Sequence, residues 1–407
     1  MAQFVTIEMH VEAAPAGPAA PHAVWGRGFR PFFLAGGLYG AFAVTVWTAM
    51  WRGWMPPPDW LAPPWWHGHE MIFGFVAAAI AGFLTTAAPV WTGRAAPTGR
   101  PLAALVGLWA LGRVAMLTAG MLPAWLVAAA DGAFLPGLAF VLARLVWRTG
   151  QYRNYGVIVL VGVLALANLA VHAQALGITT GSAPLALRFT VDIVIVLVVV
   201  IGGRITPAFT ANAFLRGGIA APIRSWWWLD RAAVAATVLV AAADLLAPRS
   251  VGSGVAAAVA AVGVAARVAG WQTLRTWRDP LVWSLHAGML WVPLGFALVA
   301  ASDLGAAIPA SAGLHALTGG AMGAMIVAVV TRVSLGHTGR PLVPPTGSSL
   351  SYALVHAGAL ARVAAALAPS APALLWAGAV LWAGAFVLFA VLHAPILLRP
   401  RVDGKPG

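Results

Sequence analysis

The sequence contains no cysteine. This absence excludes disulfide bonds, thiolate-ligated haem, covalently attached c-type haem and iron–sulfur clusters. Charged residues are also scarce: they make up 9% of the 407 residues, whereas soluble globular domains carry about 25%. Because 61% of the residues are hydrophobic, this composition excludes a water-soluble enzyme, and we expect a protein that lies in a lipid bilayer.

Apolar runs long enough to span a membrane, which takes about 20 residues, recur along the chain. Turn residues such as Pro56-Pro57-Pro58 separate these runs. The sequence therefore predicts an all-α, polytopic membrane protein with about twelve transmembrane helices. The expected spans lie near 31–51, 69–91, 102–119, 122–146, 156–176, 185–203, 228–247, 251–271, 281–302, 312–331, 350–368 and 372–397.

Acidic residues are fewer than basic ones, 11 against 24 Lys and Arg, and the net charge is +13. In a soluble domain this excess would suggest nucleic acid, but here the cations follow the predicted topology, so we expect no nucleic-acid partner. Eighteen cations lie at the N-terminus, in loops after even-numbered spans or in the C-terminal tail, four lie within spans, and only Arg52 and Arg249 lie on the other side. This bias predicts that both termini are cytoplasmic.

The domain organisation follows from these spans. Residues 1–24 lack the basic-then-apolar layout of a signal peptide and are expected to form a short soluble tail. A single twelve-helix transmembrane domain is expected over residues 25–398, followed by a cytoplasmic tail over 399–407.

Spans 2–3 resemble spans 10–11 in the same orientation. The step from a histidine to the arginine of a Thr-Gly-Arg phrase is 25 residues in both, from His69 to Arg94 and from His315 to Arg340. A second phrase, Leu-Gly-Arg-Val-Ala against Leu-Ala-Arg-Val-Ala, follows in spans 3 and 11. We infer a probable internal repeat. Parallel repeats commonly place ligand sites at their interface, which indicates His69 and His315 as a pseudo-symmetric pair.

Ionisable residues inside spans are costly and usually face the interior of a helix bundle. Arg113 and Asp131 lie at matching depths on either side of the turn between spans 3 and 4, so they can form an ion pair that clamps the helices or relays protons. Arg188 and Asp192 lie on one face of span 6. They either neutralise each other, or Arg188 binds an anionic group such as a haem propionate.

The histidines are the stronger indication of a metal site, because imidazole suits both haem iron and copper. A lone membrane histidine is more often a hydrogen-bonded packing residue, but four lie near the predicted periplasmic ends of spans 2, 5 and 10. His286 lies deeper, towards the cytoplasm, and either serves a second site or only forms hydrogen bonds. The four histidines at one depth are His67, His69, His172 and His315.

His67 and His69 flank Gly68 and precede Glu70 in the segment Trp66–Met71. Residues that are two positions apart on a regular helix face different ways. The two histidines can therefore bind one metal only where the start of the helix is irregular. Glu70 can orient an imidazole as a hydrogen-bond acceptor or carry protons. The alternative, an interfacial polar and aromatic belt, explains the neighbouring tryptophans but not the two histidines and the glutamate.

His315 shares a helix face with Gly319 and Met322. The glycines near His315 would let a flat macrocycle, or merely another helix, approach the backbone. We expect His356 and His393 to serve packing or solvation, and His337 lies in a predicted cytoplasmic loop.

Three blocks of sequence resemble the signature of the NnrS family: residues 66–94, residues 201–212 and residues 315–340. The resemblance covers residues 25 to 365. It implies a bacterial inner-membrane protein that contains haem, of b type, and copper, and that takes part in nitric oxide metabolism and protection against nitrosative stress.

The resemblance and the histidine depths together suggest a cofactor arrangement. Haem is expected between His69 and His315, and copper near His67 with His172 or His286. Two further roles are expected of charged residues: Glu70 would be catalytic, tuning a metal or supplying protons, and Arg113 or Arg188 would neutralise haem propionates.

The resemblance, together with the histidines, implies a redox enzyme or binding protein for nitric oxide, a small apolar molecule that can arrive through membrane lipid. A weaker analogy connects the chain with haem–copper oxidases and nitric oxide reductases, although span 6 has no histidine and span 7 no histidine pair. One alternative is a transporter of a small anion, metal or haem, with the histidines as relays. Another is a non-catalytic haem-based sink or sensor for nitric oxide. The sequence does not indicate the electron donor.

Overall fold

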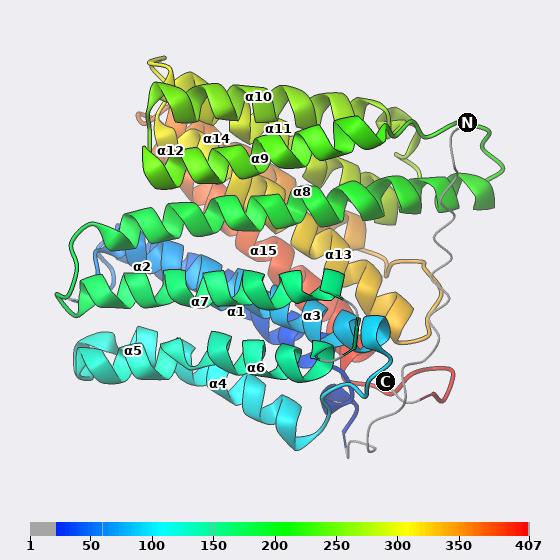
Figure 1. Cartoon of the computed structure of the whole chain (residues 1–407), viewed down its shortest axis with the longest axis horizontal. Helices are drawn as coiled ribbons and strands as arrows, with labels where there is room; N and C mark the ends of the chain where they lie inside the picture. The colour runs from blue at the N-terminus through cyan, green and yellow to red at the C-terminus, as the bar shows by residue number, and fades with distance from the viewer. Residues whose placement is uncertain (1–21, 59, 148, 151, 406–407) are drawn as a thin grey trace. The chain divides into compact units, whose positions relative to one another are not determined.

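In a computed structural model of the chain, residues 22–58, 60–147, 149–150 and 152–405 can be described, and all their regular elements are helices (Figure 1). Most of the predicted N-terminal tail lies outside these residues. The predicted all-α, polytopic membrane fold is confirmed, because eleven helices are long and apolar enough to cross a membrane.

The chain divides into two compact units, which are described separately. Among the described residues, the first unit contains residues 22–191, Val330–Gly358 and 376–405, and the second contains Asp192–Val329 and Ala359–Leu375. Helices α8, α13, α14 and α15 have residues in both units.

The helices of the first unit follow the predicted spans closely. The second span is longer than predicted and changes character within its length, from α-helix to π-helix and back. The elements are α1 (Phe29–Trp51), α2 (Pro63–His69), the π-helix η2 (Glu70–Val76), α3 (Ala77–Thr92), α4 (Arg100–Leu117), α5 (Ala124–Gly132), α6 (Phe134–Val146) and α7 (Gly156–Ala175), with short 3₁₀ turns at Ala23–Trp25, Ala119–Met121 and Tyr152–Tyr155.

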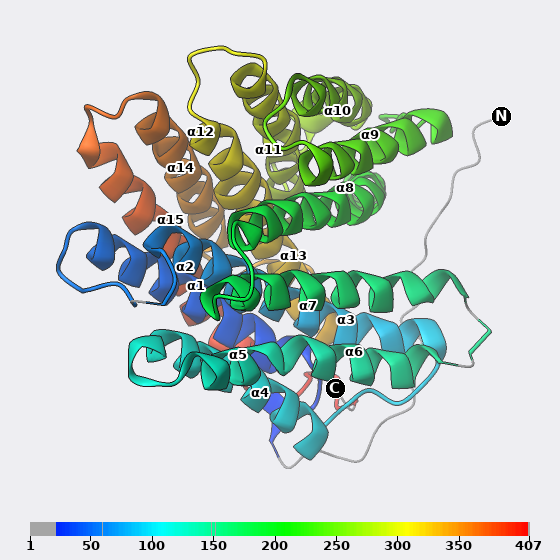
Figure 2. The same cartoon turned by 60° about the vertical axis from the view of Figure 1, so that its left-hand side comes forward.

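The second unit begins within α8. Its helices α9, α10 and α11 follow one another in sequence, and α10 packs against both α9 and α11 (Figure 2). A second π-helix interrupts its tenth predicted span. The elements are α8 (Ser182–Arg216), α9 (Trp227–Leu246), α10 (Val251–Ala269), the 3₁₀ turn Thr273–Arg275, α11 (Pro280–Asp303), α12 (Ala310–His315), the π-helix η6 (Ala316–Met322), α13 (Gly323–His337), α14 (Ser348–Leu367) and α15 (Pro372–Leu397).

Helix α8 runs to Arg216, thirteen residues beyond the predicted end of span 6 at residue 203. At the predicted end of the span, the guanidinium of Arg267 from α10 lies against Gly203 and donates to the carbonyl oxygens of Val199 (2.8 Å) and Gly203 (3.1 Å). Its Nε also donates to Asp230 of α9 at 2.5 Å. A side chain at position 203 would occupy the space of the guanidinium, so the glycine is required for this packing.

In the first unit, α1 packs closely against η2 and α3. A Cβ atom at Gly40 would lie 2.7 Å from the ring of Phe75, and one at Gly36 would lie 2.9 Å from the side chain of Ala78. The N-terminus of α1 is held to α3, since the amide of Phe29 donates to Thr86 Oγ1 at 3.0 Å.

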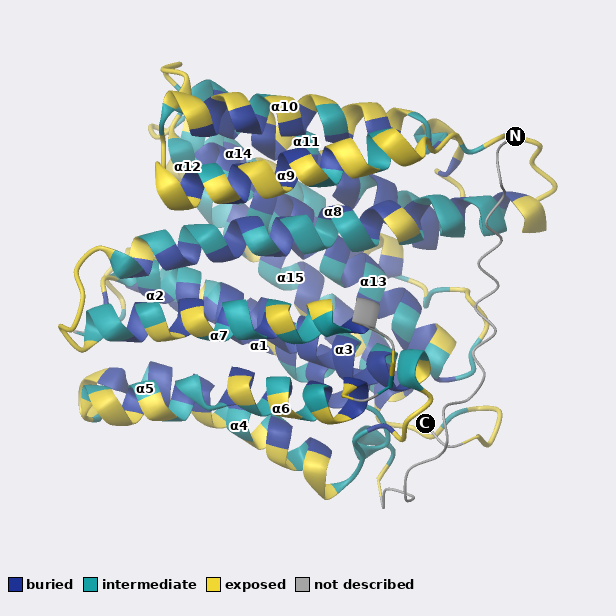
Figure 3. Cartoon of the chain, viewed as in Figure 1, coloured by how far each residue is buried: buried dark blue, intermediate teal, exposed yellow. Residues whose placement is uncertain are grey.

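Buried residues concentrate where helices face one another, and exposed ones lie on outward faces (Figure 3). These outward faces carry large apolar side chains, including Leu111, Val159, Leu166 and Val262, as a lipid-facing surface requires.

The internal repeat predicted for spans 2 and 10 has a local structural counterpart. In both spans a seven-residue π-helix begins directly after the histidine: η2 follows His69, and η6 follows His315. Such π-helices are rare and occur frequently at functional sites. The matched position of the two irregular segments therefore agrees with a duplication.

The predicted span 228–247 corresponds to α9, which is 20 residues long but carries Asp230, Arg231 and Asp244 and is not among the eleven most apolar helices. We expect α9 to cross the membrane nonetheless. Because the chain has no native cysteine, single cysteines replacing Ala220, Pro248 or Lys405 can be labelled in intact cells with a membrane-impermeant maleimide. Only Pro248→Cys should react. Equal labelling of Ala220→Cys and Pro248→Cys would contradict the crossing.

Candidate metal centre

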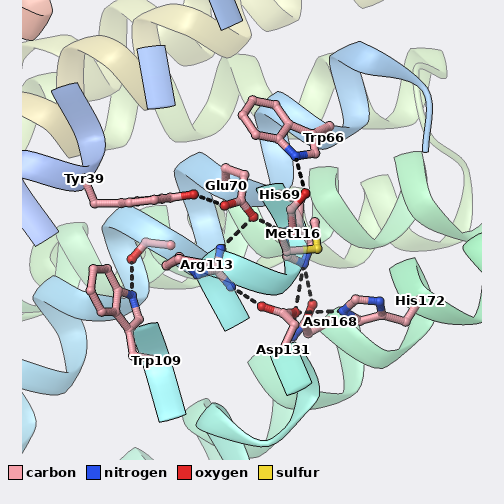
Figure 4. Close-up of polar contacts among 11 residues, drawn as sticks. Tyr39, Trp66, His69, Glu70, Trp109, Arg113, Met116, Asp131, Asn168 and His172 are labelled. Atoms are coloured by element: carbon pink, nitrogen blue, oxygen red, sulfur yellow. Dashed lines mark hydrogen bonds and ion pairs between the residues drawn. The ribbon is translucent and has the colours of Figure 1, made fainter. Parts of the chain in front are cut away.

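A cluster of polar side chains lies inside the first unit, between α1, α2, η2, α4, α5 and α7 (Figure 4). Each of its ionisable members is more than 90% buried, which is unusual because burying an unpaired charge in an apolar interior is strongly unfavourable. The members are Tyr39, His69, Glu70, Arg113, Asp131, Asn168 and His172.

Arg113 holds the cluster together by bridging two carboxylates. Its Nη1 donates to Glu70 Oε1 at 2.6 Å, and its Nη2 donates to Asp131 Oδ1. The predicted ion pair between Arg113 and Asp131 is therefore present, and it joins α4 to α5. Glu70 is the additional partner, and its second oxygen, Oε2, accepts from the hydroxyl of Tyr39 on α1.

His69 lies between oxygen atoms on both sides of its ring. Nδ1 is 2.8 Å from Glu70 Oε1, and Nε2 is 2.8 Å from Asn168 Oδ1 and 3.2 Å from Asp131 Oδ2. The amide of Asn168 donates to Asp131 at 2.8 Å, which turns its oxygen towards His69. Since every neighbour of the imidazole is an acceptor, this arrangement calls for a proton on both ring nitrogens. The imidazolium and the Arg113 guanidinium then balance the two carboxylates.

His172 completes the cluster from α7. Its Nε2 lies 2.7 Å from Asp131 Oδ2, so that one carboxylate oxygen is approached by Asn168, His69 and His172 together. Its Nδ1 is buried and has no hydrogen-bond partner within the part of the chain that the structure describes. The ring stacks on Trp60, with centroids 5.5 Å apart and planes at 13°.

His69, Asp131 and His172 can each offer one ligand atom, and these three atoms lie within 4.8 Å of one another. Two imidazoles and one carboxylate are a donor set that suits copper, zinc and non-haem iron. When His69 binds an ion through Nε2, Glu70 can accept the remaining proton on Nδ1, which is the usual outer partner of a metal-bound histidine. The donor set and its burial therefore fit a bare metal ion.

The same residues do not form a cradle for haem. A haem iron on His69 Nε2 needs a flat cleft beside that nitrogen, but Asn168 and Asp131 occupy the space at 2.8 and 3.2 Å. The two terminal nitrogens of Arg113 donate to carboxylates and do not point to a propionate site.

His315 and the nearby glycines lie in the second unit. The Nδ1 of His315 lies 2.8 Å from the carbonyl oxygen of Ser311, which leaves its ligating lone pair on Nε2. A Cβ atom at Gly320 would overlap the ring of Trp291 on α11. Of the two explanations for the glycines, the structure shows the approach of another helix. Haem between His69 and His315 stays a prediction.

The remaining predicted site residues lie outside the triad. His67 is partly exposed and stacks on Trp47, with centroids 4.8 Å apart. His286, in the second unit, forms hydrogen bonds with Thr210 (2.8 Å) and Thr273 (2.9 Å), as expected of a packing histidine. Arg188 lies in α8, one turn from Asp192. Copper binding by His67 or His286 and propionate binding by Arg188 stay predictions.

The sequence analysis did not identify Tyr39 or Asn168, and it considered Asp131 only as an ion-pair partner. One signal was available: Asn168 and His172 are four residues apart in one predicted span and therefore share a helix face. For Tyr39 the sequence carries no comparable signal, because its partner Glu70 is brought to it only by the packing of α1 against η2.

Comparison with known proteins gives one family. A family model described as NnrS protein matches residues 23–401, nearly the whole chain. No curated protein matches the chain.

We expect Arg113 to be the most important single residue for stability in this cluster. Replacing it with methionine leaves Glu70 and Asp131 buried without their counter-charge, so Arg113→Met should lower the free energy of unfolding by about 3–5 kcal/mol. Thermal unfolding of the metal-free protein in detergent measures the change. Arg231→Gln, at an exposed position, is the control and should have little effect.

A second variant separates lost charge pairing from lost packing volume. Combining Arg113→Met with Glu70→Gln and Asp131→Asn removes the unpaired charges and should recover part of the stability. Wild-type stability of Arg113→Met alone would contradict the role assigned to the bridge.

Proposed function

Because the chain belongs to the NnrS family, we propose that it is a metal-containing membrane protein of the nitric oxide response that binds or turns over nitric oxide at the buried cluster. The observation that carries this proposal is the convergence of His69, Asp131 and His172 on one point inside the first unit. The proposed membrane is the bacterial inner membrane, with the cluster towards its periplasmic side.

The ion that we propose for this triad is copper, since imidazole nitrogen is among its preferred ligands and divalent copper binds such sites most tightly among the first-row metals. A bound copper ion would supply one-electron chemistry and an open coordination position for nitric oxide. Three protein ligands with a fourth position open are typical of catalytic rather than structural metal sites.

The residues around the triad have separate tasks in this proposal. Glu70 accepts the Nδ1 proton of His69 and so directs Nε2 towards the ion. Arg113 pairs with both carboxylates and offsets their charge. Asn168 donates to Asp131 Oδ2 and orients that carboxylate.

Glu70 is also placed to move a proton. One of its oxygens accepts from the Tyr39 hydroxyl and the other lies 2.8 Å from His69 Nδ1, so the carboxylate connects the phenol with the imidazole. We propose Glu70 as the proton-holding group of the site and Tyr39 as its neighbour in the chain of hydrogen bonds.

Access to the cluster does not need a polar channel. His69 and Glu70 have no exposed surface, which excludes bulk water from the triad. Nitric oxide is small and apolar, so it can reach the buried site through lipid and between helices. A charged substrate would have to lose its hydration shell on the same path.

A carrier function is the second candidate, favoured by the matched π-helices after His69 and His315. Parallel repeats are a feature of several transporter folds. In that function, the charged cluster would bind a small anion, a metal or haem in transit, with the histidines as relays, and the protein would purify without a stoichiometric resident metal.

Metal analysis of detergent-purified protein tests the triad. We expect near-stoichiometric copper in the wild type from copper-replete cells, and its loss in His172→Ala, because that variant removes a ligand without removing a charge pair. His393→Ala, at a buried histidine that is not among the predicted metal ligands, is the matched control and should retain the metal. In Glu70→Gln, where only the outer partner changes, copper affinity should fall about 10–100-fold. Copper retained by His172→Ala, or absent from the wild type, would overturn the proposal.

Optical spectra before and after addition of nitric oxide test what the site binds. We expect air-oxidised and dithionite-reduced protein to differ, and nitric oxide to change the spectrum in the wild type but not in His172→Ala. Consumption of nitric oxide with an added electron donor would distinguish an enzyme from a sink or sensor. A haem Soret band that His69→Ala abolishes would place haem on His69 and contradict the bare-ion site, while a colourless, metal-free protein would favour the carrier.

A further inference from the structure

A second buried group of unusual character lies at the opposite end of α1 from the loop that precedes α2. Arg30 has no exposed surface, and its Nη1 donates to the carbonyl oxygens of Leu397 (2.8 Å) and Arg399 (2.7 Å). These carbonyls belong to the end of α15, where a helix lacks partners for its last carbonyl groups. One terminal nitrogen of Arg30 therefore caps α15.

The other two nitrogens of Arg30 are not used by the protein. Nε and Nη2 are both buried, and neither has a hydrogen-bond partner among the residues that the structure describes. These two nitrogens form one edge of the guanidinium, with their N–H bonds nearly parallel. That edge matches the spacing of two oxygens on a phosphate or carboxylate group. Leaving buried, charged donors unsatisfied is costly, so the edge indicates a missing acceptor.

Further cations lie close enough to Arg30 for their charges to act on it. The charges of Arg340 and Arg401 both act on Arg30, and Arg340 has a buried Nη1 without a partner in the described part of the chain. Burial, together with the charge of Arg401, lowers the pKa of Arg27. Mutual repulsion between a buried guanidinium group and its partly buried neighbours is unfavourable unless an anion compensates it.

The protein supplies only part of this compensation. Arg401 pairs with Asp403, through Nε at 2.9 Å and Nη2 at 2.5 Å, and also donates to the carbonyl oxygen of His337 at 2.8 Å. Asp403 thus neutralises one of the arginines. We name the other three, Arg27, Arg30 and Arg340, the arginine cluster.

We propose that the arginine cluster binds an oxyanion of the phosphate class, with the free edge of Arg30 as the bidentate donor and Arg340 as the second. Arg30 joins the N-terminus of α1 to the end of α15, and Arg340 follows the end of α13 in sequence, all within the first unit. The positive-charge bias predicts that these helix ends lie at the cytoplasmic surface, where anionic lipid headgroups are abundant. The phosphate is therefore either that of a lipid headgroup or free phosphate from solution. This site is independent of the metal centre.

The test measures binding of phosphatidylglycerol to the purified full-length protein by native mass spectrometry, and binding of inorganic phosphate by the shift in thermal unfolding temperature. Arg340→Gln removes a donor that caps no helix, and Arg30→Lys keeps the charge but removes the two-nitrogen edge. Both should weaken binding of at least one of the two probes by roughly tenfold or more. Arg275→Gln, an exposed arginine of the second unit, is the control and should bind as the wild type does.

The two probes distinguish the sources of the anion. If the protein retains phosphatidylglycerol in preference to phosphatidylcholine, and added phosphate does not change this preference, the anion is that of a lipid headgroup. If only inorganic phosphate stabilises the protein, the anion is the free ion. Equal binding in the wild type, Arg340→Gln and Arg275→Gln would overturn the proposal and leave Arg30 only as the cap of α15. If Arg30→Lys fails to fold, Arg340→Gln together with the lipid preference of the wild type still decides the question.

Discussion

The balance of charge inside an apolar interior is the constraint on which the first unit depends. Arg113 cannot be buried alone, and neither can Glu70 or Asp131, so the three are stable inside the unit only as a connected set. Because these residues come from α4, η2 and α5, satisfying the charges also determines how those helices face one another. His69 and Asn168 complete the set by occupying the remaining oxygen lone pairs.

The same balance prepares the cluster for a cation. In the arrangement observed, His69 sits among acceptors only and carries the charge that an ion would otherwise supply. Metal binding would therefore release a proton from His69, as is general for histidine ligands. Asp131 would exchange the hydrogen bonds on Oδ2 for a bond to the ion, while its Oδ1 keeps Arg113. Stability without metal and affinity for metal thus arise from the same contacts.

The two π-helices show how a duplicated backbone feature acquires different chemistry. His69 and the residue after it, Glu70, belong to a network of charged groups. The imidazole of His315, in contrast, contacts the carbonyl oxygen of Ser311 in its own preceding turn, and Gly320 packs on Trp291. The difference lies in the partners rather than in the repeated segment: Arg113, Asp131 and His172 are supplied by α4, α5 and α7. A repeated sequence therefore need not imply two equivalent sites.

The sequence by itself determined the class of the protein, because length and apolar periodicity set where helices cross a bilayer. All twelve apolar runs became helical, most of them within a few residues of their predicted bounds, whereas spans 2, 6 and 10 extend further. It also predicted the Arg113–Asp131 pair, since opposite charges at equal depth on neighbouring spans are stabilised by pairing, whereas Glu70 as the second partner of Arg113 is known only from the structure. The long-range partners were decided only by tertiary structure. Tyr39 and Glu70 are 31 residues apart, and His69 and Asn168 are 99 apart, so no local periodicity relates them. The same holds for Arg30 and the end of α15, 367 residues away in sequence, which meet only because packing brings α1 to α15.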